Sequence, residues 1–468
     1  MNEWMEQVSK YRKEIIEDTQ NFLRIKSVLD ESEASVTAPF GNGINEALEF
    51  LLKKGSSEGF QVKNVDGYAG HIEMGQGEEI VGILCHVDVV PEGDGWTSDP
   101  FGAEIREGKI FARGAIDDKG PTIAAFYAMK IVKEMNLPLS KRVRMIIGTD
   151  EESDWQCVAH YFKHEEMPAV GFAPDADFPI IYAEKGIVDF DLVQNHEVLK
   201  EEQESKLISF QSGRRYNMVP DFAEAKMKVA GIHTSFVEQF NEYLSVNGYI
   251  GKAILLDTLC ILQVEGKSAH AMEPNLGKNA AICLAGFLNQ YKWDQKADEF
   301  LSFIVSYFSE DSRGKCLGIG FEDDISGALT LNVGKVSYSN HSDGVIGLNM
   351  RYPVTNDITK TREQIQKVCE EHSFSLHNFS DSPPHHVAKD HPLIQTLQKV
   401  YVEQTGQDAD LISIGGGTYA RSLKNGVAFG PLFPGREDVA HQKDEHIFID
   451  DLLKATAIYA QAISELAK

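Results

Sequence analysis

Five short segments of the 468-residue chain place His, Asp or Glu side chains where they could serve as imidazole and carboxylate ligands, without a thiolate in the set. The segments are His86–Asp88, Arg113–Gly120, Thr149–Asp154, Ala173–Pro179 and Ala440–Glu445. Ligands of this kind suit catalytic zinc, manganese or cobalt better than a structural zinc site. Two such ions held about 3.5–4 Å apart by a shared carboxylate would polarise a carbonyl and lower the pKa of a bridging water. The pattern therefore indicates a catalytic centre with two divalent metal ions.

The first of these segments places His86 and Asp88 directly after Glu79–Cys85, a mostly apolar run that predicts a strand buried on both faces. A lone histidine there would more often be structural. An aspartate two residues later can accept the second imidazole N–H, which fixes the tautomer and raises the basicity of the other nitrogen. Asp88 therefore favours His86 as a metal ligand.

Two segments contain adjacent carboxylates with more than one interpretation. Asp117 and Asp118 precede a helix that starts near Pro121, where acidic residues could equally be helix caps. Thr149–Asp154 has four carboxylates in five residues after the predicted strand Val143–Gly148. On a surface loop they would be solvated, whereas beyond a buried parallel strand their repulsion needs a compensating cation. In a Glu-Glu pair, one side chain can bind metal while the other acts as general base.

Strands and helices alternate in the first part of the chain, which is typical of a parallel α/β sheet. Strands are predicted at 79–85, 143–148 and 180–182, and helices at 4–22, 44–54 and 123–135. Ligands of such sheets bind just beyond the carboxyl ends of the strands. The five segments are therefore expected to meet in one cleft.

The pattern changes near residue 186 to longer strands of alternating polarity, such as Ala223–Val229, which indicate an α+β insertion. Helices are predicted at 235–245, 280–291, 393–405 and 450–467. We expect a catalytic domain in two parts, 1–185 and 385–468, interrupted by a lid domain at 186–384. A faint repeat between 217–229 and 340–354 indicates that the lid has two similar halves.

Composition excludes several classes of protein. The chain is 42% hydrophobic and 25% charged, as in ordinary globular proteins, and its net charge of −26 disfavours nucleic acid and anionic membranes as partners. It contains no apolar run long enough for a membrane span and no recognisable export signal. The six scattered cysteines lack any C-x-x-C pair, which favours reduced thiols. These features predict a cytoplasmic protein.

The motifs resemble those of the metal-dependent peptidase and aminoacylase family, which includes carnosinases, carboxypeptidase G-type enzymes, acetylornithine deacetylases and succinyl-diaminopimelate desuccinylases. The resemblance is closest to the PepV-type bacterial dipeptidases and spans nearly the whole chain. It is carried by Cys85–Pro91, Gly93–Trp96, Arg113–Pro121 and Gly148–Ser153. It implies an α/β fold with a predominantly parallel sheet, a dinuclear metal site and an α+β lid insertion.

The same resemblance implies the metal ligands. His86, Asp117 and Asp175 would hold one ion, and Asp117, Glu152 and His441 the other, with Asp117 as the bridge. Zinc is the expected metal, with manganese and cobalt as alternatives.

The resemblance also assigns Glu151 as the general base that activates a metal-bridging water, and Asp88 as the residue that orients His86. Asp117 is chosen as the bridge because the bridging aspartate of the family stands two residues before the lysine of this motif, here Lys119. Whether Asp118 takes part in metal binding stays open. A cis peptide bond is expected between Asp117 and Asp118.

Four residues of the insertion and the following segment match family positions that bind substrate. Asn217 and His270 would close over the scissile carbonyl, where donors aimed at the oxyanion are worth a few kcal/mol each. Arg351 would bind the C-terminal carboxylate of the substrate, near backbone N–H groups around Gly416. Without the resemblance, His270 is a loop or capping histidine and Arg351 pairs with a structural carboxylate.

The implied function is metal-dependent hydrolysis of dipeptides that have a free C-terminal carboxylate. The long insertion resembles that of enzymes that supply both halves of the lid from one chain, so a monomer is expected. An N-acyl amino acid deacylase of the same family is the nearer alternative. A non-catalytic metal-binding or peptide-binding protein is the more distant one.

Overall fold

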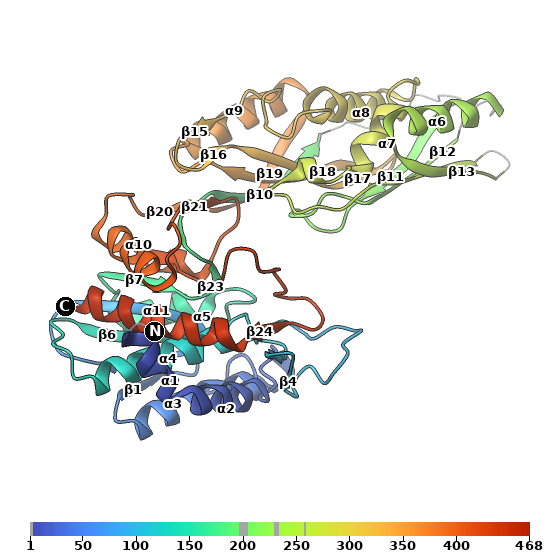
Figure 1. Ribbon diagram of the computed structural model, residues 1–468. Helices are drawn as coiled ribbons and strands as arrows, with labels where there is room; N and C mark the ends of the chain where they lie inside the picture. The colour runs from blue at the N-terminus through green and yellow to red at the C-terminus, as the bar shows by residue number, and fades with distance from the viewer. Residues whose placement is uncertain (1–2, 196–204, 229–233, 257–258) are drawn as a thin grey trace. The chain divides into compact units, whose positions relative to one another are not determined.

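The computed structural model describes residues 3–195, 205–228, 234–256 and 259–468, which form two compact units (Figure 1). The first unit contains Met1–Ala183, His386–Ile412 and Thr418–Lys468, and the second contains Glu184–His385 and Ser413–Gly417. Val229, the last residue of one predicted strand, lies outside the described residues. The first unit is therefore assembled from segments on both sides of the second in the sequence.

A mixed sheet with a parallel centre forms the core of the first unit. Its strands are β1 (Gln61–Val65), β2 (Ala69–Met74), β3 (Ile80–His86), β6 (Arg142–Gly148), β7 (Val170–Ala173), β9 (Ile180–Glu184), β20 (His385–His386), β21 (Leu411–Ile414) and β22 (Gly426–Ala428). Their order is β1-β2-β6-β3-β7-β22-β9-β20, with β21 also paired to β9. The four strands from β6 to β22 are parallel, and β1 and β2 add antiparallel pairing at one edge. The predicted α/β class is confirmed, and every residue of β3 is buried.

Helices cover both faces of this sheet. They are α1 (Glu3–Lys10), α2 (Arg12–Leu23), α3 (Asn42–Ser57), α4 (Lys119–Glu134), α5 (Gln156–His164), α10 (Pro392–Thr405) and α11 (Ile449–Ala467). On one face α4 and α11 pack together against the sheet, and α1, α2 and α10 pack on them from outside. This double cover explains why every residue of α4 from Lys119 to Met129 is buried, on all sides of the helix. On the other face, Tyr161 of α5 bonds to His71 of β2.

Smaller strands support the loops around the carboxyl end of the sheet. They are β4 (Glu104–Arg106), β5 (Lys109–Phe111), β8 (Ala176–Asp177), β23 (Pro431–Leu432) and β24 (His446–Phe448). β24 pairs with β5, and β23 pairs with β8. Segments more than 250 residues apart in the sequence are thus joined beside the strand ends.

Two predicted helices differ in their limits. The expected helix at 4–22 is two helices, because α1 ends at Lys10 and α2 begins at Arg12. Val8, Ile15 and Phe22 are nevertheless all buried. The helix expected at 280–291 ends at Leu288.

The second unit is an antiparallel sheet with helices α6 to α9 along one face (Figure 1). The strands, in spatial order, are β13 (Ile250–Leu256), β14 (Leu259–Glu265), β12 (Phe222–Lys228), β11 (Lys206–Ser212), β17 (Thr330–Ser339), β18 (Ser342–Tyr352), β10 (Gly186–Gln194) and β19 (Phe374–Ser382). The helices are α6 (Thr234–Asn247), α7 (Ala280–Leu288), α8 (Gln295–Phe308) and α9 (Ile358–Glu371). Buried and exposed residues alternate along β12 and β14, as expected for a sheet with one covered face.

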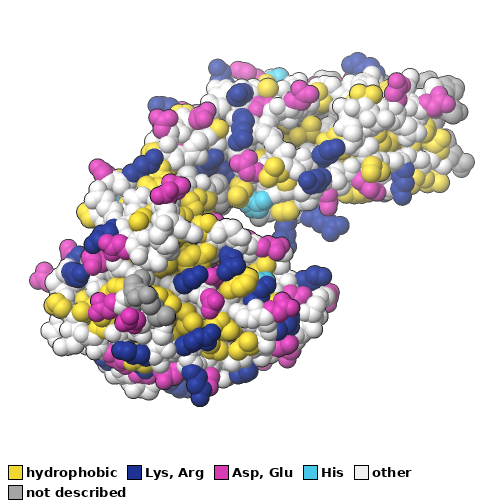
Figure 2. All heavy atoms as spheres, viewed as in Figure 1, with side chains coloured by type: hydrophobic (Ala, Val, Ile, Leu, Met, Phe, Trp, Pro, Cys, Tyr) yellow, Lys and Arg dark blue, Asp and Glu magenta, His cyan; other side chains and the backbone are white. Residues whose placement is uncertain are grey.

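Surface properties agree with an ordinary globular protein. On the face shown in Figure 2, acidic and basic side chains are interspersed and do not gather in one patch. None of the helices in the described part of the chain combines the length and apolar character needed to span a bilayer. All six cysteines are free.

Candidate active site

The expected metal ligands lie where the central strands of the first unit end. His86 is the last residue of β3, Glu152 follows β6, and Asp175 follows β7. These three strands are parallel neighbours, so their carboxyl ends meet at one edge of the sheet. Asp117 comes just before α4, and His441 lies between β23 and β24. The fold thus brings all five residues to one place.

The Asp117 carboxylate lies between two imidazoles. Its Oδ1 is 3.0 Å from Nε2 of His86, and its Oδ2 is 2.9 Å from Nε2 of His441. Nε2 of His441 is also 3.0 Å from the Glu152 carboxylate, and Nε2 of His86 is 3.6 Å from that of Asp175. Each oxygen of Asp117 therefore faces a different group of ligands, which is the arrangement that a shared carboxylate requires in a two-metal site.

The ligand atoms form two groups, in each of which all atoms lie within 4.8 Å of one another. Asp117, Glu152 and His441 form one group, which is the set expected for the second ion. His86 and Asp175 form the other group together with Glu151, the residue expected to act as general base. Glu151 is therefore close enough either to bind metal or to exchange a proton beside it.

Asp88 holds the histidine and the glutamate pair in position. Nδ1 of His86 lies 3.0 Å from the Asp88 carbonyl oxygen and 3.4 Å from its carboxylate. The carboxylate accepts hydrogen bonds from the backbone N–H groups of Glu151 at 3.1 Å and Glu152 at 2.9 Å. An acceptor at Nδ1 leaves Nε2 of His86 to face the other ligands. Sequence reasoning missed the anchoring of the two glutamates, because it depends on backbone donors.

The peptide bond between Asp117 and Asp118 is cis, as the family resemblance implies. Asp118 directs Oδ2 to the backbone N–H of His86 at 3.2 Å and to the Thr122 hydroxyl at 3.1 Å. Its Oδ1 is buried and has no hydrogen-bond partner within the described residues. The side chain of Asp118 accepts no hydrogen bond from a backbone N–H of the first turn of α4. The helix-cap interpretation is therefore wrong for this residue.

Crowding shifts the pKa values of these groups. Burial and the charge of Asp117 raise the pKa of Glu152 to about 7, and burial raises that of Asp175 to about 6. Burial and the charge of Asp175 raise the pKa of Glu151 well above its ordinary value. Hydrogen bonds to Asp117 and Glu152 raise the pKa of His441 to about 11. The carboxylates disfavour one another's ionisation, and a divalent cation would supply the compensating charge.

The donor set therefore fits a pair of divalent transition-metal ions. It offers two imidazole nitrogens and several carboxylates. One of these carboxylates, that of Asp117, has one oxygen facing each of the two groups of ligand atoms. These are ligands that zinc, manganese and cobalt accept. The second imidazole nitrogen of His86 is already held by an acceptor, as in many metal sites.

A buried ion pair joins the two loops that carry Asp117 and His441. Glu445 directs Oε1 to the backbone N–H of Ile116 at 3.0 Å and of Asp117 at 3.3 Å. Its Oε2 is 2.5 Å from Nη1 of Arg113, and both side chains are almost fully buried. Arg113 also donates to the Gln442 carbonyl at 3.3 Å. Sequence reasoning gave Glu445 no role, since its partner lies 332 residues away.

We expect Glu445→Gln to lower metal affinity by about 10–100-fold, because supporting residues of metal ligands have effects of this size. The amide keeps an oxygen for the Asp117 backbone but loses the charge that faces Arg113. Equilibrium dialysis against zinc measures the effect, and Glu437→Gln, at an exposed position in the same loop region, is the matched control. Equal affinity in Glu445→Gln and the control would contradict this positioning role.

Asn217 and His270 lie on neighbouring loops of the second unit. Met218 and His270 form an isolated antiparallel bridge, and the N–H of Ala271 donates to the Asn217 carbonyl at 2.9 Å. Nδ2 of Asn332, in β17, donates to the Met218 carbonyl at 3.0 Å. The loops that carry Asn217 and His270, both expected to bind substrate, are therefore held next to each other by backbone contacts.

The environment of His270 favours a neutral ring with the proton on Nε2. The backbone N–H of Met272 donates to Nδ1 at 3.2 Å, so Nδ1 is an acceptor. Burial and the nearby Arg351 guanidinium lower the pKa of His270. Nε2 can then act as a hydrogen-bond donor near neutral pH.

Arg351 extends toward the glycine-rich segment Ser413–Gly417, which belongs to the same unit. Its Nε donates to Oδ1 of Asn349 at 2.8 Å, and its Nη1 donates to the Gly415 carbonyl at 3.2 Å. A side chain at Gly416 would meet nothing closer than Ile414, at 3.8 Å. His270, Arg351 and the glycines thus lie in one part of the second unit.

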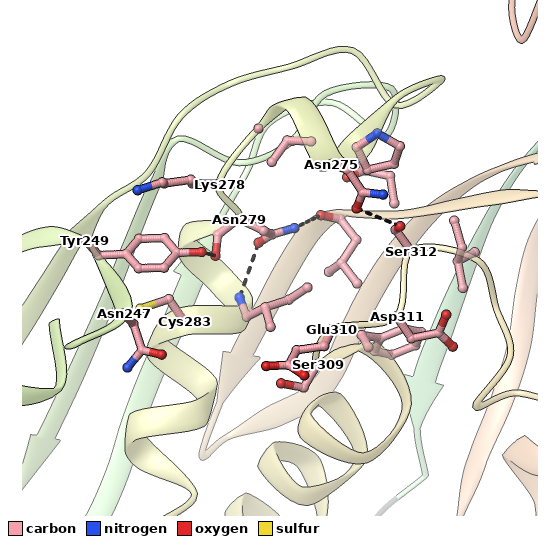
Figure 3. Close-up of a pocket in the computed structure, with 18 of the residues that line it drawn as sticks. Asn247, Tyr249, Asn275, Lys278, Asn279, Cys283, Ser309, Glu310, Asp311 and Ser312 are labelled. Carbon is pink, nitrogen blue, oxygen red and sulfur yellow. Dashed lines mark hydrogen bonds between the residues drawn. The ribbon is translucent and has the colours of Figure 1, made fainter. Parts of the chain in front are cut away.

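A separate pocket of about 340 Å³ lies within the second unit between α7, β17 and the segment after α8 (Figure 3). Several of its polar groups are paired with one another. Asn279 caps α7 and donates to the Val333 carbonyl, and Asn275 accepts from the Ser312 hydroxyl. The pocket contains none of the expected metal ligands.

Comparisons with known proteins identify the family of the chain. Residues 82–465 match the description "Peptidase family M20/M25/M40". The Bacillus subtilis (strain 168) protein named "Putative dipeptidase YtjP" is 59% identical over 465 residues, which cover 99% of this chain and 100% of that protein. A Staphylococcus epidermidis protein named "Putative dipeptidase" is 45% identical over 99% of both chains.

Solved structures share the fold at low sequence identity. Human carnosine dipeptidase 1 has a TM-score of 0.56 at 14% identity, covering 99% of this chain and 98% of its own. The aminopeptidase PepT from Bacillus cereus has a TM-score of 0.57 at 16% identity, covering 98% and 99%. With imidazoles and carboxylates gathered at the strand ends and relatives similar over their whole length, the chain belongs to peptidase family M20/M25/M40.

Proposed function

We propose that this protein is a metal-dependent dipeptidase that cleaves dipeptides with a free C-terminal carboxylate. The position of the Asp117 carboxylate between His86 and His441 carries the proposal, because this residue would be able to offer one oxygen to each of two ions. The relatives named as dipeptidases, similar over the whole chain, support the same substrate class.

The proposed ligands are His86, Asp117 and Asp175 for one ion and Asp117, Glu152 and His441 for the other. Ions bound there would polarise the scissile carbonyl and lower the pKa of a water molecule. Glu151 takes the proton of the attacking water on its carboxylate and returns it to the leaving amine. Its partial burial and the nearby carboxylates make it able to hold that proton.

Residues of the second unit are proposed to bind the substrate. His270 would donate from Nε2 to the developing oxyanion, with Asn217 on the adjoining loop as a further donor. Arg351 would pair with the C-terminal carboxylate, and the open backbone at Gly416 would allow close approach of the substrate. We accordingly propose that the first unit is the catalytic domain and the second is the lid.

Several finer assignments are part of the proposal. Zinc is proposed as the metal, since the donors are imidazoles and carboxylates, although manganese and cobalt accept the same set. A monomer is proposed because one chain contains every residue assigned above. The cytoplasmic location stays a prediction from the sequence.

The test is a panel of free, C-amidated and N-acetylated dipeptides hydrolysed by the metal-loaded protein. We expect C-terminal amidation to lower kcat/KM by about 10–100-fold, the equivalent of one charge-assisted hydrogen-bonded contact. In Arg351→Gln this discrimination should disappear while hydrolysis of the amide is retained.

Two outcomes would contradict the proposal. Equal hydrolysis of free and amidated dipeptides would remove the role of Arg351. Preference for N-acetylated substrates would instead favour an N-acyl amino acid deacylase, which does not meet a free amine in its substrate.

A further inference from the structure

A second group of candidate metal ligands lies in the first unit, apart from the centre at the strand ends. It consists of Asp66, in the turn between β1 and β2, and of His160 and His164 in α5. Each side chain offers one ligand atom, and these atoms all lie within 4.8 Å of one another. We propose that these three residues bind an additional divalent transition-metal ion.

The spacing of the two histidines suits a shared ion. His160 and His164 are four residues apart in α5, so both rings lie on the same face of the helix. Their ring centroids are 4.3 Å apart, and Nε2 of His160 is 3.0 Å from Oδ2 of Asp66. Ligand atoms at 2.0–2.1 Å from a tetrahedral zinc ion are roughly 3.3 Å apart. The His160–Asp66 pair is already near this separation, and one ring nitrogen of His164 lies within 4.8 Å of both of the other ligand atoms.

The donors are held in position by neighbouring groups. Nδ1 of His164 donates to the His160 carbonyl at 2.9 Å, which leaves Nε2 with its lone pair available. The ring of His160 stacks on Tyr68, with centroids 4.3 Å apart and planes 20° from parallel. The turn that carries Asp66 is fixed by a hydrogen bond from the Gly67 N–H to Asn64 at 2.8 Å. An ion would replace the proton that His160 shares with Asp66.

The chemistry of the group selects the class of ion. Two imidazoles and one carboxylate suit zinc, cobalt, nickel or copper, whereas magnesium and calcium prefer sets made only of oxygen atoms. The Asp66 side chain is 67% exposed and that of His160 is 25% exposed, so water can complete the coordination. The site is therefore an open one on the surface of the unit.

An ion at this position would join two elements that flank the glutamate pair of the catalytic centre. The Thr149 hydroxyl donates to the Tyr68 carbonyl in the β1–β2 turn, just before Glu151 and Glu152. α5, which carries both histidines, begins at Gln156 shortly after them. The ion would link the turn to the helix and so restrain the segment between Thr149 and Gln156 at both ends.

The test counts zinc bound to tag-free protein by equilibrium dialysis and elemental analysis. The His160→Ala/His164→Ala double variant should bind one ion fewer per chain than the wild type. The same difference should appear in an Asp117→Ala background, so the result does not depend on the proposed catalytic centre. Asp66→Asn should weaken binding of this ion by at least about tenfold.

His377→Ala, which removes an exposed histidine of the second unit, is the control and should leave the count unchanged. Circular dichroism in the presence of a chelator verifies that each variant folds. If the double variant binds as many zinc ions as the wild type, the proposal is wrong and the three residues form only a hydrogen-bonded cluster.

Discussion

Replacing Glu151 by glutamine is expected to lower kcat by about 10²–10⁴-fold, the usual contribution of a general base. The amide nearly matches the carboxylate in size but cannot take a proton from the attacking water. The backbone N–H of Glu151 bonds to Asp88 and does not involve the side chain, so the loop should keep its conformation. Steady-state kinetics on a free dipeptide, with metal content measured on the same sample, gives the result.

Metal content separates the two roles that the geometry allows for Glu151. Its carboxylate lies in one group with His86 and Asp175, within reach of an ion. If Glu151 carries a proton, the variant keeps as many ions as the wild type and loses only turnover. If it is a ligand, the variant loses an ion together with its activity, and the assignment as general base fails.

Glu78→Gln is a suitable control for this substitution. Glu78 is exposed and lies just before β3, at the opposite end of that strand from His86. The same chemical change there should leave kcat and metal content unaltered. Activity of Glu151→Gln equal to that of this control would remove Glu151 from the mechanism.

The apolar strand β3 was predictable from the sequence, whereas β2, which buries polar residues, was not. β3 has seven buried residues in a nearly continuous apolar run, so its position was clear. β2 is also fully buried, but it contains His71 and Glu73, which bond to Tyr161 and Arg144. Polar residues can be buried there because other elements supply their hydrogen-bond partners. They interrupt the apolar pattern on which strand prediction depends.

The five segments could be recognised because they combine imidazoles and carboxylates, several of them at predicted strand ends, and the family resemblance then implied which residues are ligands. The residues that position them were less visible. Glu445 contacts the Asp117 backbone and Arg113 across more than 300 residues of sequence. The segment Ser413–Gly417 belongs to the second unit although the residues on either side of it belong to the first. Such relations arise from tertiary packing and leave no local pattern.

Replacing Asp117 by asparagine should have the larger effect on the metal centre itself. Oδ1 faces His86 at 3.0 Å and Oδ2 faces His441 at 2.9 Å, so both oxygens are needed. Asparagine supplies one oxygen and no charge, and can serve only one of the two groups. We expect at least one ion fewer per chain and a fall in kcat/KM of more than about 10³-fold, since each ion provides several kcal/mol of transition-state stabilisation.

Asp118→Asn is the matched comparison for Asp117→Asn, because it makes the same change at the adjacent residue. The Asp118 carboxylate bonds through Oδ2 to the backbone N–H of His86 and to the Thr122 hydroxyl. The Asp118 variant should therefore retain both ions, whereas the Asp117 variant should not regain full occupancy even when zinc is added in excess. Loss of an ion from Asp118→Asn with full occupancy in Asp117→Asn would transfer the bridging role to Asp118, and would show that the two imidazoles face a carboxylate that does not join the ions.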